Sequence, residues 1–359
     1  MRKAGEIWLG PEGETSLKGL LLLAREMQAT DLHILAGSPV YARVDGALRA
    51  ITDSPLTAST ARHLAFAMLS ERQRATFDET LDVDLMCVDD DQHRYRLNVG
   101  YANGTIGAVV RLLPRIPLPL EQLKLPPLVE AMTHRGKGLV LITGSTSQGK
   151  TTTMASMVDA INQHSRKHIV TIEDPIEYVH PQGQSLIRQR EVGRDTATFT
   201  SGLRAALRQD PDVVLIGEMR DYDTIEIALR AASSGVLVIS TVHIVSVERL
   251  MDRLLSYAPP GRELLIRTMA SEALQLVVHQ ELLPTVDGGK RVAAEVVLGT
   301  RAVRNMLKTG SDTQLRSAIL SGRDVGMVTM QASVDALLNE GAISEEVRDA
   351  VLKNYAVST

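Results

Sequence analysis

A run of residues near the middle of the chain has the types and spacing that bind the phosphates of a nucleotide. It reads Gly144-Ser145-Thr146-Ser147-Gln148-Gly149-Lys150-Thr151 and fits the phosphate-loop pattern G-x-x-x-x-G-K-[ST] at every fixed position. The glycines let the backbone bend so that its N–H groups face phosphate oxygens. Lys150 can reach the β- and γ-phosphates, and the Thr151 hydroxyl can ligate Mg²⁺. Together with Thr152, the next residue, these residues form the expected nucleotide-binding segment.

The segments on either side of this loop have the strand and helix patterns that a phosphate loop requires. Residues 138–143 are a short, apolar, β-prone run, and residues 152–161 carry apolar side chains at a spacing compatible with a helix. The N-terminus of that helix adds the positive end of its dipole to the phosphate site. We therefore expect a strand, the loop and a helix in that order.

Three other predicted strands end in acidic or titratable groups. Glu218 ends an apolar run, which is typical of the Walker B motif and places its carboxylate at the sheet edge beside the phosphate loop. Residues 171–177 contain three acids, among them Glu177. Clustered carboxylates repel one another unless a cation lies among them. We favour a functional cluster over a solvated acidic loop because this strand should lie next to the strand before the phosphate loop. His243 ends a further strand, where it could sense the γ-phosphate.

The composition of the chain limits the classes of protein to which it can belong. Its 359 residues suit two or three domains, and 44% of them are hydrophobic, as in ordinary globular proteins. A formal net charge of −4 and an aromatic content of 3% argue against a broad nucleic-acid-binding surface. Cys87 is the only cysteine, which excludes a disulfide within the chain and a cysteine-based zinc cluster. A lone cysteine suits a reducing compartment.

The hydropathy pattern gives no sign of a membrane span. No apolar run approaches the roughly 20 residues that a spanning helix needs. The N-terminus has no apolar region of the kind that a secretory signal carries. We expect a cytoplasmic protein that associates with a membrane only through its partners.

The order of the predicted elements indicates an α/β protein with two folded parts. Residues 1–113 are predicted to form a small α+β domain, and residues 114–127, with five prolines, a stiff extended connector. Residues 128–298 alternate strands with helices, which implies a parallel-sheet core, and residues 299–359 are predicted to form a helical region.

The limits of the individual elements follow from hydrophobic periodicity and turn residues. In the first part we expect helices at 16–28 and 57–79, a hairpin at 41–49, and strands at 81–88, 93–101 and 105–113. In the second part we expect strands at 139–143, 169–173, 213–217 and 236–241. From about residue 262 the pattern is mostly helical, apart from a short strand at 292–298.

Short motifs over nearly the whole chain resemble those of the type II/IV secretion ATPase superfamily, the hexameric motors of type IV pili and related secretion systems. Besides the phosphate loop, the matching segments are 30–33 (T-D-L-H), 94–98 (R-Y-R-L-N), 171–177 (the Asp box), 217–221 (G-E-M-R-D, the Walker B motif) and 241–243 (T-V-H, the His box). The G-E-M-R-D sequence, with A-V-R-N-M-L at 302–307, is similar to the PilT-type branch that retracts pili.

This resemblance implies a fold, an activity and a role for particular residues. The implied fold is a PAS-like N-terminal α+β domain joined to a RecA-like ATPase core. The implied activity is Mg²⁺-dependent ATP hydrolysis that drives movement between the two domains and powers pilus retraction. Lys150 and Thr151 would bind phosphate and Mg²⁺, and Glu218 would hold the Mg²⁺ shell. Glu177 would be the general base or water-orienting acid, and His243 would couple the γ-phosphate to domain movement.

The resemblance also implies partners outside the core. Arg94, Arg96 and Arg111 of the N-terminal domain would bring positive charge to a nucleotide. The implied assembly is a cytoplasmic homo-hexamer, held at the inner membrane by the platform protein of the pilus. Other pilus ATPases are further implied partners, whereas nucleic acid and direct membrane insertion are not expected.

The chain departs from the family pattern in three places. The family loop usually reads G-P-T-G-S-G-K, and here Ser145, Ser147 and Gln148 stand for Pro, Gly and Ser. Residues 244–245 are Ile-Val, where the His box usually continues with Thr-Asn. The segment around Arg111 reads V-R-L-L-P in place of F-R-x-I-P. These departures bear on the rate and the branch more than on nucleotide binding.

Three other functions stay open at this point. A motor of a type IV secretion or conjugation apparatus would have the same chemistry, and neighbouring genes for pilins or secretion channels would separate the two. A nucleic-acid-translocating motor would show DNA-stimulated ATP hydrolysis. A catalytically weak regulatory subunit that binds nucleotide is compatible with the altered loop and His box.

Overall fold

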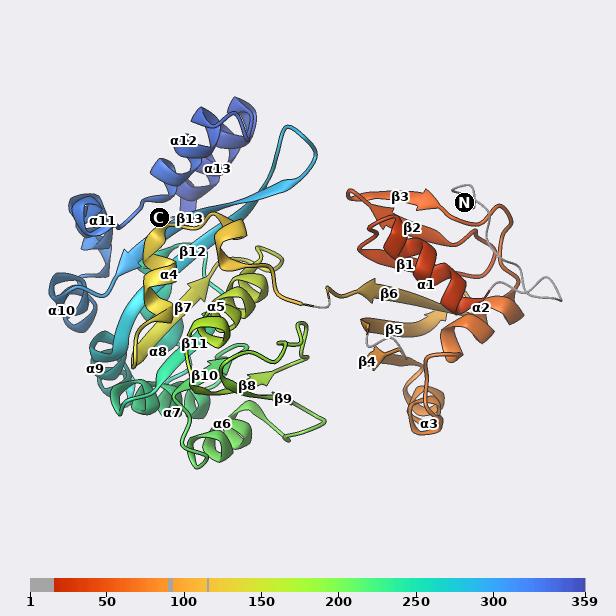
Figure 1. The fold of residues 1–359 in the computed structure, drawn as a ribbon, viewed down its shortest axis with the longest axis horizontal. Helices are drawn as coiled ribbons and strands as arrows, with labels where there is room; N and C mark the ends of the chain where they lie inside the picture. The colour runs from red at the N-terminus through yellow and green to blue at the C-terminus, as the bar shows by residue number, and fades with distance from the viewer. Residues whose placement is uncertain (1–15, 90–92, 115, 359) are drawn as a thin grey trace. The chain divides into compact units, whose positions relative to one another are not determined.

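The chain divides between residues 115 and 116 into two compact units, which are described separately (Figure 1). The computed structural model describes residues 16–89, 93–114 and 116–358. Residues 1–15, at the start of the expected first domain, lie outside the described residues.

The Pro-rich segment is only partly extended. Leu120–Leu123 forms a 3₁₀-helix, η1, and Leu120 is buried in the core of the second unit. The expectation of an extended connector over 114–127 is therefore wrong for residues 120–123. They form a helix because Leu120 packs into the core of the second unit. We keep 1–113, 128–298 and 299–359 as a proposed division of the remaining chain.

An antiparallel sheet forms the first unit, with its strands in the order β3-β2-β1-β6-β5-β4. The strands are β1 (Asp31–Ile34), β2 (Tyr41–Val44), β3 (Ala47–Ala50), β4 (Asp82–Val88), β5 (Arg94–Ala102) and β6 (Thr105–Leu112). The helices are α1 (Leu17–Glu26), α2 (Ala58–Phe66) and α3 (Glu71–Thr80). Their apolar faces and one face of the sheet enclose a common core.

Alternating side chains explain why β5 has one buried face. Tyr95, Leu97 and Val99 are buried, whereas Arg96 and Asn98 point to the exposed face. The three strands and the hairpin that the sequence predicts for this unit are confirmed.

The helical stretch predicted at 57–79 is two helices rather than one. Ser70 begins α3 as its N-cap and forms a capping box with Gln73. This cap satisfies the free N–H groups of a new helix and ends the connection from α2.

A mixed sheet runs through the second unit in the order β13-β12-β7-β11-β10-β8-β9. Its strands are β7 (Gly138–Thr143), β8 (His168–Glu173), β9 (Leu186–Glu191), β10 (Val213–Ile216), β11 (Leu237–Val242), β12 (Leu274–Pro284) and β13 (Lys290–Leu298). Neighbouring strands are parallel except β12 and β13, which form an antiparallel hairpin. The predicted α/β class is confirmed.

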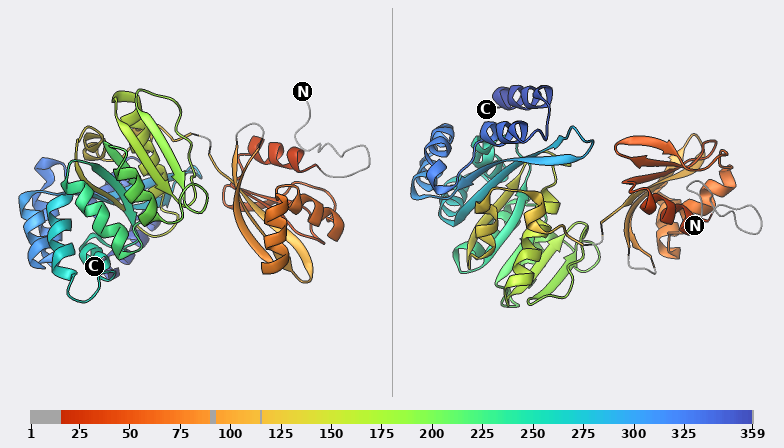
Figure 2. Two further views of the ribbon diagram at one scale, coloured as in Figure 1. Left: turned by 90° about the horizontal axis from the view of Figure 1, so that it is seen from below. Right: turned by 45° about the horizontal axis from the view of Figure 1, so that its top comes forward.

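Helices cover both faces of the central strands (Figure 2). Strands β7, β10 and β11 are buried along their whole length, which is why their sequences are largely apolar. Helices α4 and α5 pack on one face, and α6, α7 and α9 pack on the other. The helices of this unit are α4 (Pro127–Thr133), α5 (Lys150–His164), α6 (Phe199–Leu207), α7 (Tyr222–Ser233), η2 (Val247–Arg249), α8 (Leu250–Leu255), α9 (Glu263–Ala273), α10 (Arg301–Thr309), η3 (Asp312–Gln314), α11 (Leu315–Ser321), η4 (Arg323–Val325), α12 (Met330–Asn339) and α13 (Glu345–Ser358).

Three strands of this sheet differ from the prediction. Strand β8, expected next to β7, is separated from it because β11 pairs with β7 and β10 lies between β11 and β8. The expectation of a mostly helical pattern after residue 262 is wrong over β12, whose short apolar run fits a helix or a strand by periodicity alone. Pairing with both β7 and β13 buries Leu276 and Val278 and decides for the strand. Strand β9 is the last strand of the sheet. The sequence does not predict it because residues 188–190 are polar and interrupt the hydrophobic pattern of a strand.

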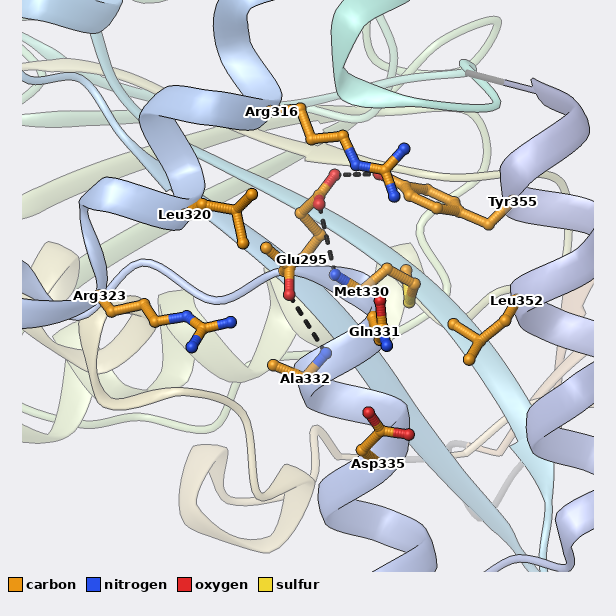
Figure 3. A pocket seen from close by; sticks show the side chains of 11 residues that line it. Glu295, Arg316, Leu320, Arg323, Met330, Gln331, Ala332, Asp335, Leu352 and Tyr355 are labelled. Atoms are coloured by element: carbon orange, nitrogen blue, oxygen red, sulfur yellow. Dashed lines mark hydrogen bonds between the residues drawn. The ribbon is translucent and has the colours of Figure 1, made fainter.

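The C-terminal helices are attached to the sheet around a buried carboxyl group on β13 (Figure 3). Glu295 is 2% exposed, and the hydroxyl of Tyr355 on α13 donates a hydrogen bond to it. The backbone N–H of Met330, at the start of α12, donates to the other carboxyl oxygen at 3.3 Å. The ring of Tyr355 also lies 6.2 Å from that of His279 on β12, centroid to centroid. These contacts join α12 and α13 to the β12–β13 hairpin.

This buried carboxyl group should make the stability of the protein depend on pH. Burial raises the pKa of Glu295 from 4.5 to about 7, against the bond from Tyr355 and the charge of Arg316, and Glu248 adds to the rise. Because the folded chain binds this proton more tightly, the contribution of Glu295 to the free energy of unfolding should be fully present below pH 4.5 and be lost as the pH rises to about 7. In thermal unfolding below and above this window, Glu295→Gln should differ from wild type by the loss of this contribution, while exposed Glu340→Gln should match wild type. Equal pH dependence in wild type and Glu295→Gln would contradict this account.

Candidate functional site

The phosphate loop joins the end of β7 to the start of α5, as the sequence predicts. Gly144, Ser147 and Gly149 have φ angles of 136°, 64° and 78°, and these left-handed residues bend the loop over the helix N-terminus. A Cβ atom at residue 144 would lie 2.4 Å from the carbonyl oxygen of Gln280 on β12. Only glycine therefore fits at the start of the loop.

Lys150 lies inside the loop with 7% of its surface exposed. Its Nζ donates to the carbonyl oxygens of Gly144 at 2.9 Å and Ser145 at 2.5 Å, and lies 3.3 Å from Nδ1 of His243. Burial lowers the pKa of Lys150 to about 8, and the Glu218 carboxylate opposes this shift. The ammonium group is thus placed between the loop backbone and the ends of neighbouring strands.

Glu218 links the ends of β10 and β11 to this lysine. Its Oε2 lies 2.7 Å from Nη2 of Arg220 and 3.2 Å from Nε2 of His243, and 15% of its side chain is exposed. The imidazole of His243 therefore stands between the Lys150 ammonium and the Glu218 carboxylate. The structure brings together three residues that the sequence assigned to one site.

Hydrogen bonds between β10 and β11 hold Glu218 and His243 in register. The hydroxyl of Thr241 donates to the carbonyl oxygen of Gly217 at 2.6 Å, and that of Ser240 donates to Ile216 at 2.8 Å. Because the strands are parallel, both end at the same edge of the sheet. The acid and the histidine that follow them consequently meet.

The carboxylate of Glu173 is buried and hydrogen-bonded at the end of β8. The residue is 7% exposed, and its Oε1 accepts hydrogen bonds from Oγ1 of Thr171 at 2.6 Å and Nε2 of Gln189 at 3.2 Å. These bonds tie the end of β8 to β9. Among the acids of 171–177, this carboxylate is the one held within the sheet.

Glu177 is half-buried, and the residue that follows it in the chain contacts α5. The hydroxyl of the following residue, Tyr178, lies 2.7 Å from Oγ1 of Thr152 in the first turn of α5. The acidic segment is therefore anchored to the helix that follows the phosphate loop.

A pocket opens beside the loop at the ends of β10 and β11. Its lining includes four residues that the sequence predicts, namely Ser145, Thr146, Glu218 and His243. The other lining residues are Arg220, Ile244, Val245, Arg253 and Tyr257. Sequence reasoning gave no role to Arg220, although it stands within the Walker B motif, and nothing in the sequence marks Arg253 or Tyr257.

The donors at this edge fit a hard divalent cation that is also held by phosphate. The Thr151 hydroxyl and the Glu218 carboxylate are oxygen donors of the kind that Mg²⁺ prefers. Within residues 16–89, 93–114 and 116–358, no group of three or more His, Cys, Asp or Glu side chains could hold a metal ion. Such an ion would take most of its ligands from phosphate oxygens and water.

The three predicted arginines share one face of the sheet in the first unit. Arg94 and Arg96 are two residues apart on β5, and Arg96 is directly opposite Arg111 on β6. Nη2 of Arg96 lies 2.6 Å from Asp84, and Nε of Arg111 donates to Asp31 at 2.8 Å. Their position on a common face agrees with the prediction, and their role at a nucleotide stays a proposal.

A model of the family described as type II/IV secretion system protein matches residues 17–325. The chain belongs to this family. The resemblance that the motifs indicate is thereby confirmed. Within the described residues, no helix is long and apolar enough to cross a membrane.

Three relatives place the chain more narrowly within the family. The chain is 40% identical to the type IV pilus retractation ATPase PilT of Pseudomonas aeruginosa, over 91% of this chain and 95% of that protein. It is 39% identical to a twitching motility protein of Neisseria gonorrhoeae, over 85% and 82%. The crystal structure of the pilus retraction motor PilT with bound ADP superposes with a TM-score of 0.85 at 38% identity, over 93% of this chain and 96% of that one.

Proposed function

We propose that this chain is a Mg²⁺-dependent ATPase motor that powers type IV pilus retraction and thereby the cell movement called twitching. The observation that carries the proposal is the cluster of Lys150, His243 and Glu218 around a complete phosphate loop. The names of the Pseudomonas and Neisseria relatives support both the ATPase activity and the role in retraction. Hydrolysis would be coupled to movement between the two units.

Each residue of the cluster has a task that its position allows. The N–H groups of the loop and the N-terminus of α5 bind the phosphates, and Lys150 exchanges its carbonyl partners for phosphate oxygens. Thr151 and Glu218 would hold Mg²⁺, which would supply positive charge to neutralise the phosphates. Glu177 orients the attacking water. His243 reports the state of the γ-phosphate to β11.

The working form that we propose is a homo-hexamer in the cytoplasm. Its partners would be the platform protein of the pilus, through which it reaches the inner membrane, and other pilus ATPases. Arg94, Arg96 and Arg111 would complete the site with positive charge. A secretion or conjugation motor is the alternative with the same chemistry. A nucleotide-binding regulatory subunit is a further alternative, with which Gln148 and Ile244-Val245 are compatible.

Replacement of Glu177 and replacement of Glu218 should impair ATP hydrolysis in different ways. Glu177→Ala should lower kcat by about 10²-fold or more, because a water-orienting base acts in the chemical step. Glu218→Ala should also raise the Mg²⁺ concentration needed for half-maximal rate. Steady-state ATP hydrolysis over a Mg²⁺ series measures both, with Glu226→Ala, a partly buried carboxylate paired on α7, as the control. Normal hydrolysis by Glu177→Ala would mean that another group is the base. Of the two candidates Glu173 and Asp174, exposed Asp174 would be tested first, because Glu173 is hydrogen-bonded within the sheet.

A genetic test separates retraction from the alternatives. In the source bacterium, deletion of the gene should leave surface pili that no longer shorten, and twitching should return with the wild-type gene but not with Lys150→Ala. Normal pilus retraction in the deletion strain, together with loss of protein or DNA export, would favour the secretion motor.

A further inference from the structure

Gln148 stands between two left-handed residues of the phosphate loop. Ser147 has φ of 64° and Gly149 has φ of 78°. Glycine adopts this conformation freely, whereas a residue with a Cβ atom adopts it at a cost in free energy. The loop of this chain therefore contains a serine at a position where its conformation needs outside support.

Strand β12 supplies that support because it continues past the end of β7. The last pair between the two strands is His279 with Thr143, so the next residues of β12 face the loop. The backbone N–H of Leu282 donates to Oε1 of Gln148 at 2.5 Å.

A second glutamine, Gln280 on β12, forms a hydrogen bond with the backbone of Gln148. Nε2 of Gln280 donates to the carbonyl oxygen of Gln148 at 2.6 Å, and its Oε1 accepts from Oγ1 of Thr153 at 3.0 Å. Gln280 is 0% exposed, so both ends of its amide are satisfied by these bonds within the core. The loop and the first turn of α5 are thus fastened to one side chain of β12.

We propose that Gln148 is a positioning residue whose side chain, bonded to β12, holds the loop in its phosphate-binding shape and offsets the strain at Ser147. The hydrogen bond made by Gln148 compensates for the backbone strain at Ser147. This inference rests on the proposed nucleotide-binding function. The Gln148 side chain points to β12, while the backbone N–H groups of the loop bind phosphate. Its loss should therefore weaken nucleotide binding and leave the chemical step nearly unchanged.

The test compares nucleotide affinity and turnover in four variants. Fluorescence titration with N-methylanthraniloyl-ADP gives Kd, and steady-state ATP hydrolysis gives KM and kcat. Gln148→Ala should raise Kd and KM by about 3- to 10-fold, the size of one hydrogen bond, with kcat within about twofold. Gln148→Met, which keeps the length and loses the acceptor, should do the same. In Ser147→Gly/Gln148→Ala, the glycine removes the strain, so Kd should return to within about twofold of wild type.

The matched control is Gln209→Ala. Gln209 accepts a side-chain hydrogen bond from Arg188 at 3.1 Å and precedes β10, at the opposite edge of the sheet from the loop. Its replacement should leave Kd and KM unchanged. Thermal unfolding of every variant shows whether any change in affinity reflects loss of folded protein.

Two results would overturn the inference while the proposed function stands. One is wild-type affinity in both Gln148→Ala and Gln148→Met. The other is weakened binding in Gln148→Ala that Ser147→Gly does not restore, because a merely structural contact would not be rescued by relieving strain one residue away. A wild-type chain that binds neither the labelled ADP nor ATP would contradict the proposed function and the inference together.

Discussion

Replacement of Lys150 by alanine should reduce ATP hydrolysis by at least about 10²- to 10³-fold, the cost of losing one preorganised donor to transition-state charge. Lys150 is the only cationic side chain of the loop, and its Nζ is held among the carbonyl oxygens of Gly144 and Ser145 and the ring of His243. Its removal also takes away the ammonium group that lies 3.3 Å from His243.

The control for this variant is Lys167→Ala. Lys167 donates to the carbonyl oxygen of Arg135 at 3.0 Å and precedes β8, at the edge of the sheet opposite the loop. Steady-state phosphate release should be near wild type for Lys167→Ala and at background for Lys150→Ala. Wild-type turnover by Lys150→Ala would remove the phosphate loop from the mechanism.

Loss of the arginines on the first unit should be comparably severe. A phosphate loop binds the triphosphate from one side, and a positive group at its open side is worth about 10³- to 10⁵-fold in systems with an arginine finger. We expect Arg94→Ala/Arg111→Ala to bind nucleotide and to hydrolyse ATP slower by a factor in this range. Arg49→Ala, an exposed arginine paired with Asp45 on the same sheet, is the control and should hydrolyse ATP normally.

A mixing experiment shows whether these arginines act between chains. Arg94→Ala/Arg111→Ala has an intact loop, and Lys150→Ala has intact arginines. Co-assembled rings should regain part of the activity if an arginine completes the site of a neighbouring chain. No recovery in mixed rings would contradict the action of these arginines between chains. Full activity of a wild-type monomer, shown by light scattering, would contradict the proposed hexamer.

The sequence predicts the central strands well because each is a largely apolar run buried on both faces. Strand β7 and the loop were recognisable together, since their order and spacing are local. Strand β12 was not, because its apolar residues suit a buried helix equally and only pairing with β7 and β13 settles its structure. The break at Ser70 was missed because a single capping residue outweighed a continuous helical pattern.

In the site, too, the sequence predicts contacts that follow from local patterns and misses those between segments far apart in the chain. Glu218 and His243 could be placed together because both follow parallel strands, whose ends meet at one edge. Gln280 could not be connected with Gln148, since the two lie 132 residues apart and meet only through the position of β12. Glu295 likewise has no local signal, because its pKa depends on the helices that bury it.

The most direct test of the central claim is steady-state phosphate release by the purified wild-type chain with ATP and Mg²⁺. Our account predicts saturable turnover that stops when Mg²⁺ is removed by a chelator. A chain that binds ATP but releases no phosphate at any Mg²⁺ or protein concentration would contradict the account and identify a nucleotide-binding regulatory subunit instead.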